Sequence, residues 1–318
     1  MMKKLVSLVL ALMLCLSCVS ALAAEAWTVT CPWAPSGVAA MVNQKAASLS
    51  TTYSQDYVLV ANAEKGDTAT INSWLTKYTE ADPQMCFIGE GMFGITAILD
   101  PERMNFTYDD FEYVENLYSS IFVASARKEL GITSIDALKA YLEEGNQIMV
   151  GTNGATGSEA FLAAALIGAM GYGDQFYLIP YESAAEAAQA VARGEVDIAV
   201  SHQSQILETW QQGGVDVFAA FDGEPIAQGP FKGVEGVGQY GYPYFRNRCF
   251  IFAKAGADEQ KIADLKALYA QILTDEEMVD WLNNTMLLEA DMMTEEEVIA
   301  HIDNVKNIVE EYYDLVAE

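Results

Sequence analysis

Short apolar runs alternate with helical patterns along most of this chain, and that alternation limits its fold more than any other feature. Strands are expected at residues 27–31, 57–60, 84–88, 121–125, 148–151, 177–180, 196–201, 215–220 and 248–253. Most of the stretches between them carry the apolar periodicity or the start signals of helices. Strands joined by helices form parallel sheets with helices on both faces, so the sequence predicts an α/β fold rich in parallel strands.

The alternation occurs in two blocks, which predicts two lobes. An aromatic and acidic stretch at 106–113 separates the blocks, and the strand expected at 248–253 follows a long glycine-rich loop. We expect the first lobe at 24–117, the second at 118–245 and a return to the first at 246–318, which makes two crossovers. Open parallel sheets bind ligands at the carboxyl ends of their strands, close to helix N-termini. Two facing lobes therefore predict a ligand cleft between them.

Residues 1–23 have the pattern of a secretory signal peptide. A basic start precedes an apolar run over 5–20, and Ala21-Leu22-Ala23 fits the small-x-small cleavage site. We therefore expect export and an extracytoplasmic mature protein. The run has 16 residues, fewer than the roughly 20 that a membrane helix needs. A lipid anchor on Cys18 is the less favoured alternative, because Cys15 stands where such lipoproteins carry leucine.

Acidic side chains outnumber basic ones by 45 to 17, which gives a formal net charge of −28. Such a surface repels phosphate backbones and anionic membranes, so no nucleic-acid partner is expected. An anionic ligand must then be held by something other than a basic surface. Three cysteines follow the leader, at Cys31, Cys86 and Cys249. Their number and spacing indicate neither a disulfide framework nor a metal site, although one pair could still be oxidised. No metal or other cofactor is expected.

Two strand-to-helix loops, 32–37 and 151–158, contain small polar residues and no lysine or arginine. A helix N-terminus offers unpaired N–H groups and about half a positive charge, which can bind a carboxylate without a basic side chain. The candidate ligand-binding residues in these loops are Ser36, Gly37, Thr152, Asn153, Gly154, Thr156, Gly157 and Ser158. The alternative is that both loops are ordinary turns, in which glycine and serine are common.

Residues that follow other expected strands add to the candidates. They are Trp33, Tyr181, Ser201 and His202. Glu182 would repel a carboxylate, which points to a ligand that also carries an amino or other polar group. Arg246 and Arg248 lie near a crossover and are expected to pair with surface acids. His301, on the expected C-terminal helix, is expected to be solvated.

Five short motifs in a fixed order carry a family resemblance. The run 29–37 reads V-T-C-P-W-A-P-S-G, and 106–111 reads F-T-Y-D-D-F. The loop 151–162 reads G-T-N-G-A-T-G-S-E-A-F-L, followed by I-P-Y-E-S at 179–183 and G-E-V-D at 194–197. Together, behind a signal peptide, they resemble the substrate-binding receptors of the tripartite tricarboxylate transporter family, also called Bug-type receptors.

The resemblance implies a two-lobed venus-flytrap fold of the type II periplasmic-binding-protein class. It implies a monomeric receptor that captures a small organic carboxylate and delivers it to integral membrane transporter subunits. The chain departs from the family pattern at three places. Ser36 replaces the first of two paired glycines, Phe161 replaces the usual histidine, and Asn247-Arg248-Cys249 stands where the family has Trp-Arg-Gly. These departures leave the identity of the ligand open.

Two alternatives to this interpretation stay open. One is a receptor for an amino acid or another polar solute that serves a different class of importer. The other, less favoured, is a secreted enzyme, because the sequence has no GxSxG, HExxH or P-loop pattern. Ser201 and His202 are adjacent and do not suggest a catalytic triad, since neighbouring residues of a strand point to opposite faces.

Overall fold

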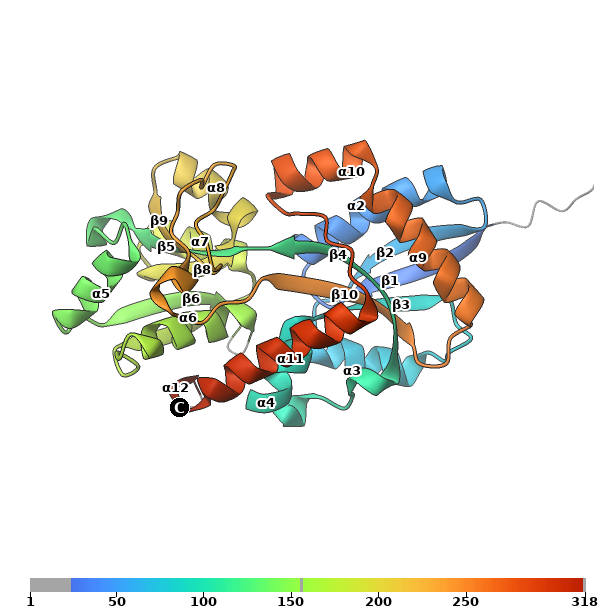
Figure 1. Ribbon diagram of the computed structural model, residues 1–318, viewed down its shortest axis with the longest axis horizontal. Coiled ribbons are helices and arrows are strands. Elements are labelled where there is room, and N and C mark those ends of the chain that lie inside the picture. The colour runs from blue at the N-terminus through green and yellow to red at the C-terminus, as the bar shows by residue number, and fades with distance from the viewer. Residues whose placement is uncertain (1–23, 155–156, 317–318) are drawn as a thin grey trace, which may run out of the picture.

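The computed structural model describes residues 24–154 and 157–316. Within them the chain forms two lobes that lie side by side, each built on a five-stranded sheet (Figure 1). The expected leader, with Cys18, lies outside the described residues. No helix in the described part is long and apolar enough to cross a membrane.

The sheet of the first lobe joins the start of the chain to a late strand, in the order β2-β1-β3-β10-β4. Its strands are β1 (Glu25–Cys31), β2 (Tyr57–Ala63), β3 (Gln84–Gly89), β4 (Phe111–Ser120) and β10 (Asn247–Lys254). β1 is parallel to β2 and β3, whereas β10 is antiparallel to β3 and β4. β10 enters this lobe from the second one, so it runs against its neighbours.

The sheet of the second lobe has the order β7-β6-β8-β5-β9. Its strands are β5 (Phe122–Arg127), β6 (Ile148–Asn153), β7 (Phe176–Tyr181), β8 (Ile198–His202) and β9 (Val215–Ala220). β6 is parallel to β7 and β8, and β5, which arrives from the first lobe, is antiparallel to β8 and β9. The predicted α/β fold is confirmed. Both sheets are mixed because each receives a strand from the other lobe.

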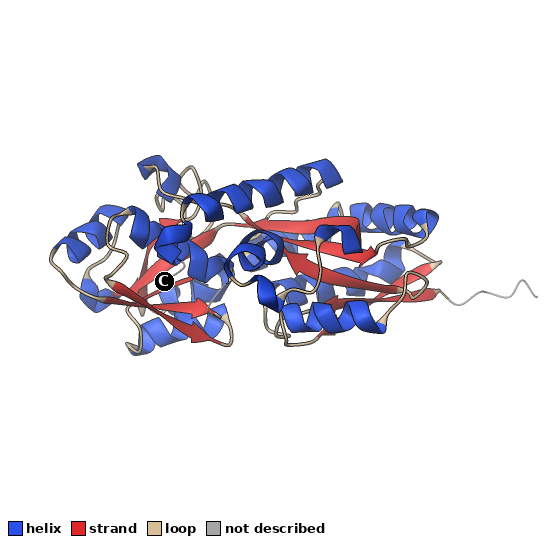
Figure 2. Ribbon diagram, turned by 90° about the horizontal axis from the view of Figure 1, so that it is seen from below, coloured by secondary structure: helices blue, strands red, loops and turns tan. Residues whose placement is uncertain are grey.

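Helices cover both faces of the sheets (Figure 2). The helices are α2 (Val38–Tyr53), α3 (Thr68–Lys77), α4 (Ala97–Leu99), α5 (Ile135–Glu143), α6 (Ser158–Ala169), α7 (Ala184–Arg193), α8 (Gln203–Gln211), α9 (Glu259–Leu273), α10 (Glu276–Trp281), α11 (Glu295–Glu311) and α12 (Tyr313–Val316). Eleven residues of α6 are buried, which explains why all of its residues after Glu159 are apolar or small. That helix starts directly at the interlobe boundary.

The C-terminal helix α11 packs against both lobes (Figure 1). Val298 and Ile302 belong to a core cluster of the first lobe, and Val305 and Val309 belong to a core cluster of the second. These four residues recur at intervals of three and four, which places them on one face of the helix. The lobes are therefore joined by α11 as well as by the two crossovers.

The crossovers lie where β4 leads into β5 and where residues 244–246 lead into β10. β4 and β10 also pair with each other between the lobes (Figure 1). The isolated bridge between Ser119 and Glu289 adds a further connection, with the Ser119 N–H donating to the Glu289 carbonyl at 2.9 Å. The two crossover strands are therefore hydrogen-bonded to each other at the boundary between the lobes.

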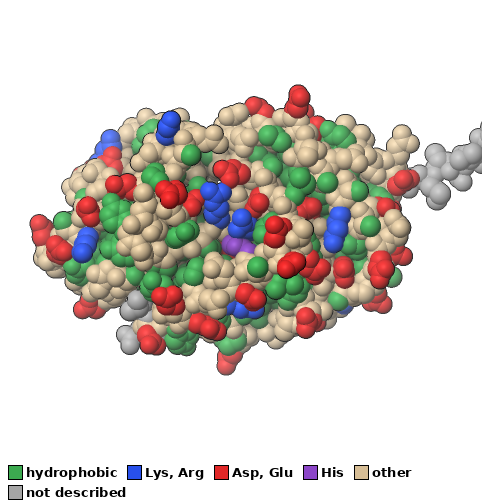
Figure 3. All heavy atoms as spheres, in the orientation of Figure 1, with side chains coloured by type: hydrophobic (Ala, Val, Ile, Leu, Met, Phe, Trp, Pro, Cys, Tyr) green, Lys and Arg blue, Asp and Glu red, His purple; other side chains and the backbone are tan. Residues whose placement is uncertain are grey.

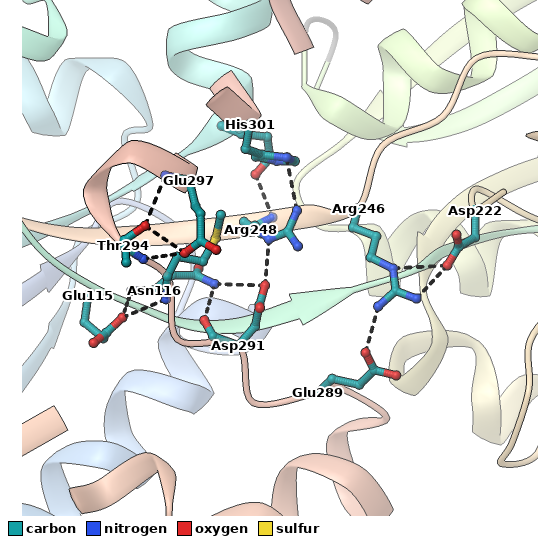
Figure 4. A network of polar contacts seen from close by, with 12 residues as sticks. Glu115, Asn116, Asp222, Arg246, Arg248, Glu289, Asp291, Thr294, Glu297 and His301 are labelled. Carbon is teal, nitrogen blue, oxygen red and sulfur yellow. Dashed lines mark hydrogen bonds and ion pairs between the residues drawn. The ribbon is translucent and has the colours of Figure 1, made fainter. Parts of the chain in front are cut away.

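Arginines on the second crossover pair with acids, as expected. Arg246 contacts Asp222 at 2.8 Å and Glu289 at 2.7 Å, and Arg248 contacts Asp291 at 2.6 Å (Figure 4). Figure 3 shows acidic side chains spread over this face of the molecule, with basic side chains beside a histidine at its middle and others towards its edges. These ion pairs join the crossover strand to the segment that leads into α11.

The prediction that His301 is solvated is wrong. Its Nδ1 accepts a hydrogen bond from Arg248 Nη1 at 3.0 Å (Figure 4). Burial, together with the neighbouring Arg248 charge, lowers the pKa of His301 to about 3. The ring is therefore neutral at physiological pH and supports the crossover.

Candidate functional site

A cavity of about 390 Å³ lies between the lobes, a size that is typical of small-molecule sites. The carboxyl ends of five strands reach it, through Pro32 after β1, Glu90 after β3, Asn153 on β6, Tyr181 on β7 and His202 on β8. The N-terminal residues of α2, α6 and α7 also line it. This is the place that open α/β sheets offer to a ligand.

The structure brings most of the candidate residues together in this cleft. Those that line it are Trp33, Gly37, Asn153, Gly154, Gly157, Ser158, Tyr181 and His202. Ser36, Thr152 and Ser201 do not line it, and Thr156 lies outside the described residues. Thr152 is buried, with its Oγ1 donating to the Gly154 carbonyl at 2.7 Å, and the buried Ser201 precedes His202 on β8 and so points away from it.

The start of α2 leaves backbone donors unused. Gly37 is the N-cap in an extended conformation, and no side chain caps the helix. Among the described residues, the N–H groups of Val38 and Ala39 have no hydrogen-bond acceptor, although both residues are buried and line the cleft. The first turn carries no acidic residue. Free donors at the positive end of a 16-residue helix form an anion-binding site.

The start of α6 is different, because the protein's own acids occupy it. Ser158 Oγ donates to Glu90 Oε1 at 3.0 Å, and Glu159 lies in the first turn. Gly157 caps this helix with an ordinary φ of −80°, and the left-handed glycine of the loop is Gly154, with a φ of 76°. The positive end of α6 therefore already faces carboxylates.

Glu90 is a buried carboxylate that connects both lobes and the second crossover. It is 0% exposed. Besides Ser158, it accepts hydrogen bonds from Asn247 Nδ2 at 2.9 Å and from the Arg248 N–H at 2.8 Å. Burial raises the pKa of Glu90, and these donors oppose the shift. The sequence did not single this residue out, although its signal is an acid between two glycines directly after an apolar strand.

Glu159 is the second buried carboxylate of the cleft, with 6% of its surface exposed. Burial raises the pKa of Glu159 to about 7, and the charges of Glu90 and Asp67 add to the increase. Hydrogen bonds from its own N–H and from Asn153 oppose it. An acid at the second position of a helix is common on surfaces, so the sequence did not single this one out.

The two basic side chains that line the cleft are engaged with acids. Lys65 of the first lobe pairs with Glu182 of the second at 2.6 Å, and the hydrogen bond from Lys65, followed by its charge, lowers the pKa of Glu182. Arg103 pairs with Asp67 at 3.1 Å. The Lys65–Glu182 pair is exposed and spans the mouth of the cleft from one lobe to the other.

His202 lies beside the first crossover. Its Nδ1 is 2.7 Å from Ser120 Oγ, and its ring centroid lies 4.6 Å from that of Phe122. Burial lowers the pKa of His202 to about 3, so the ring is neutral at physiological pH. A neutral imidazole can donate or accept one hydrogen bond, and it adds no charge for an anionic ligand.

Cys31, Cys86 and Cys249 are buried and free. Burial raises the pKa of all three thiols, which makes them unreactive. Among the described residues, no group of three acidic, histidine or cysteine side chains is placed to hold a metal ion.

The fold is shared with several solved structures of binding proteins. An R. palustris protein solved with adipate has a TM-score of 0.80 at 15% identity, covering 91% of this chain and 96% of its own. The periplasmic binding protein BugD has a TM-score of 0.78 at 16% identity, covering 92% and 98%. MatC from Rhodopseudomonas palustris, solved with bound malate, has a TM-score of 0.75 at 17% identity, covering 92% and 98%.

No curated protein matches the sequence. The family described as "Tripartite tricarboxylate transporter family receptor" matches residues 55–308. That match includes most of both lobes, the second crossover and the acid-lined start of α6. The chain therefore belongs to the receptor family of the tripartite tricarboxylate transporters.

Proposed function

We propose that this protein is an extracytoplasmic receptor that captures a small carboxylate between its lobes and delivers it to a tripartite tricarboxylate-type membrane transporter. The observation that carries the proposal is the pair of N–H groups at the start of α2 that have no acceptor in the described part of the chain, inside a cleft of about 390 Å³. Two solved proteins of the same fold are described with adipate and with malate. A monomer suffices for this function, since both walls of the cleft belong to one chain.

A thermal-shift screen followed by titration calorimetry tests the proposal. The panel contains mono-, di- and tricarboxylates, amino acids, and neutral sugars of similar size. At least one carboxylate-bearing compound should raise the melting temperature and bind with one-to-one stoichiometry. Stabilisation by sugars alone would contradict carboxylate capture. Uptake by vesicles that contain the transporter subunits tests delivery, and it should require the loaded receptor.

Ligand binding is expected to make the molecule more compact. Hinge closure around a ligand is the usual response of two lobes joined by crossovers. We expect bending in the two crossovers, near residues 115–122 and 244–252. The helix α11, which packs against both lobes, should limit the direction of closure. Small-angle X-ray scattering should show a smaller radius of gyration at saturation with a compound found by the screen. An unchanged radius would mean that the lobes are rigid.

The mature protein is expected to begin near Ala24. The basic start, the short apolar run and the Ala-x-Ala pattern all favour cleavage after Ala23. Mass spectrometry of the exported protein measures the new N-terminus. Retention of Met1 would contradict the prediction, and a lipid on Cys18 would show the lipoprotein alternative instead.

A further inference from the structure

Glu159 lies at the boundary between the lobes without a positive charge to balance it. It stands in the first turn of α6, lines the cleft and has 6% of its surface exposed. Among residues 24–154 and 157–316, no ion pair includes this carboxylate. Burying a carboxylate without an opposite charge is unfavourable. The free energy of this charge therefore depends on how closely the lobes approach each other.

The groups that favour the ionised form of Glu159 belong to its own lobe. Its backbone N–H and the side chain of Asn153, on β6, donate hydrogen bonds to the carboxylate. The positive end of α6 acts in the same direction. Because α6 and β6 are parts of one lobe, these contributions stay in place when the lobes separate.

The groups that oppose ionisation of Glu159 act from across the boundary. Burial is the largest cause of its raised pKa, and the charges of Glu90 and Asp67 add to it. Glu90 follows β3 and Asp67 precedes α3, so both acids belong to the first lobe. Glu90 also contacts the start of α6 through Ser158 at 3.0 Å. Opening the cleft would hydrate Glu159 and move both acids away from it.

The other ionisable groups of the cleft are paired or have shifted pKa values. The remaining charged or titratable side chains that line it are Lys65, Asp67, Glu90, Arg103, Tyr118, Tyr181, Glu182, His202 and Cys249. Lys65 pairs with Glu182, and Arg103 pairs with Asp67. Burial raises the pKa of Tyr118, Tyr181 and Cys249 and lowers that of His202 to about 3. Glu159, whose pKa is about 7, changes its charge near neutral pH.

We propose that closure of the cleft takes up a proton at Glu159, so the receptor closes more readily and binds its ligand more tightly as the pH falls from 8 to 6. The statement about the ligand rests on the proposed function, whereas the statement about closure concerns the empty protein. A pKa of 4.5 in the open form, its ordinary value, and of about 7 in the closed form change the closed-to-open ratio about tenfold over this range.

Small-angle X-ray scattering of the empty receptor at pH 8 and pH 6 tests the closure. Exposed carboxylates stay ionised over this range. The wild type should have a smaller radius of gyration at pH 6, and Glu159→Gln should have the small radius at both pH values. Glu143→Gln is the matched control and should behave as the wild type, because Glu143 is an exposed acid on α5 of the same lobe. An equal wild-type radius at the two pH values, or a change that persists in Glu159→Gln, would overturn the proposal.

Calorimetry tests the coupling to the ligand, with adipate and malate as probes. Titrations at pH 7 in HEPES and in Tris measure the protons taken up on binding, since the two buffers differ in ionisation enthalpy. Binding to the wild type should take up about half a proton per ligand, and binding to Glu159→Gln should take up none. The wild-type affinity should rise about tenfold from pH 8 to pH 6, and that of the variant should stay constant.

Two negative results have different meanings. Binding of a probe without proton uptake would overturn the proposal, while carboxylate capture would stand. If no carboxylate bound at all, the proposed function would be contradicted, and the scattering of the empty receptor would still decide whether closure takes up a proton.

Discussion

Gly37→Val is expected to weaken ligand binding by a hundredfold or more. A Cβ at this position lies 3.0 Å from the Ala34 carbonyl oxygen, and the branched side chain would crowd the N–H groups of Val38 and Ala39 where the ligand anion is proposed to bind. Losing two charge-assisted hydrogen bonds costs about 3–6 kcal/mol, at about 1.5–3 kcal/mol each. That loss corresponds to about a hundredfold or more in Kd. Titration calorimetry with the screened ligand measures it.

Lys65→Met is the comparison that separates this mechanism from an ordinary salt bridge. Lys65 lines the cleft, yet it is about half exposed and pairs with Glu182. Exposed ion pairs contribute about 0–1 kcal/mol, so the affinity should fall less than about fivefold. Circular dichroism must show that both variants are folded. If Lys65→Met abolished binding and Gly37→Val preserved it, a basic side chain rather than the helix terminus would hold the anion.

The sequence predicted the lobes because their signals are local. Apolar runs of four to six residues alternate with helical patterns, and each run can be recognised without knowing its neighbours. β4 was missed since Glu112, Glu115 and Asn116 interrupt its apolar pattern. In the structure, the C-terminal segment contacts two of these residues: the Met293 N–H donates to Glu115 at 3.2 Å, and Asn116 Nδ2 donates to the Asp291 carbonyl at 2.6 Å. A contact between residues so far apart in the chain has no local signal.

The cleft was predictable only in part, for the same reason. Gly37, Asn153 and Gly157 were found because strand-to-helix loops rich in small residues mark ligand sites in α/β proteins. Glu90 and Asn247 were not found, because their roles depend on β3 and β10 being neighbours. The sequence showed that the loops carried no basic residue. It did not show that the protein's own carboxylates occupy the start of α6.

Glu159→Gln is expected to raise the free energy of unfolding by about 3 kcal/mol more at pH 8 than at pH 4. The pKa of Glu159 rises from 4.5, its ordinary value, to about 7 in the folded chain. Below pH 4.5 both the folded and the unfolded chain hold this proton, so the carboxyl group costs no stability. Between pH 4.5 and 7 the unfolded chain releases the proton first, and stability falls until it levels off above pH 7. The difference between the two pKa values corresponds to about 3 kcal/mol of unfolding free energy.

Urea unfolding of both proteins at pH 4 and pH 8 measures this difference, and Glu143→Gln, which removes an exposed acid, should show much less pH dependence. Equal effects of Glu159→Gln at the two pH values would contradict the prediction.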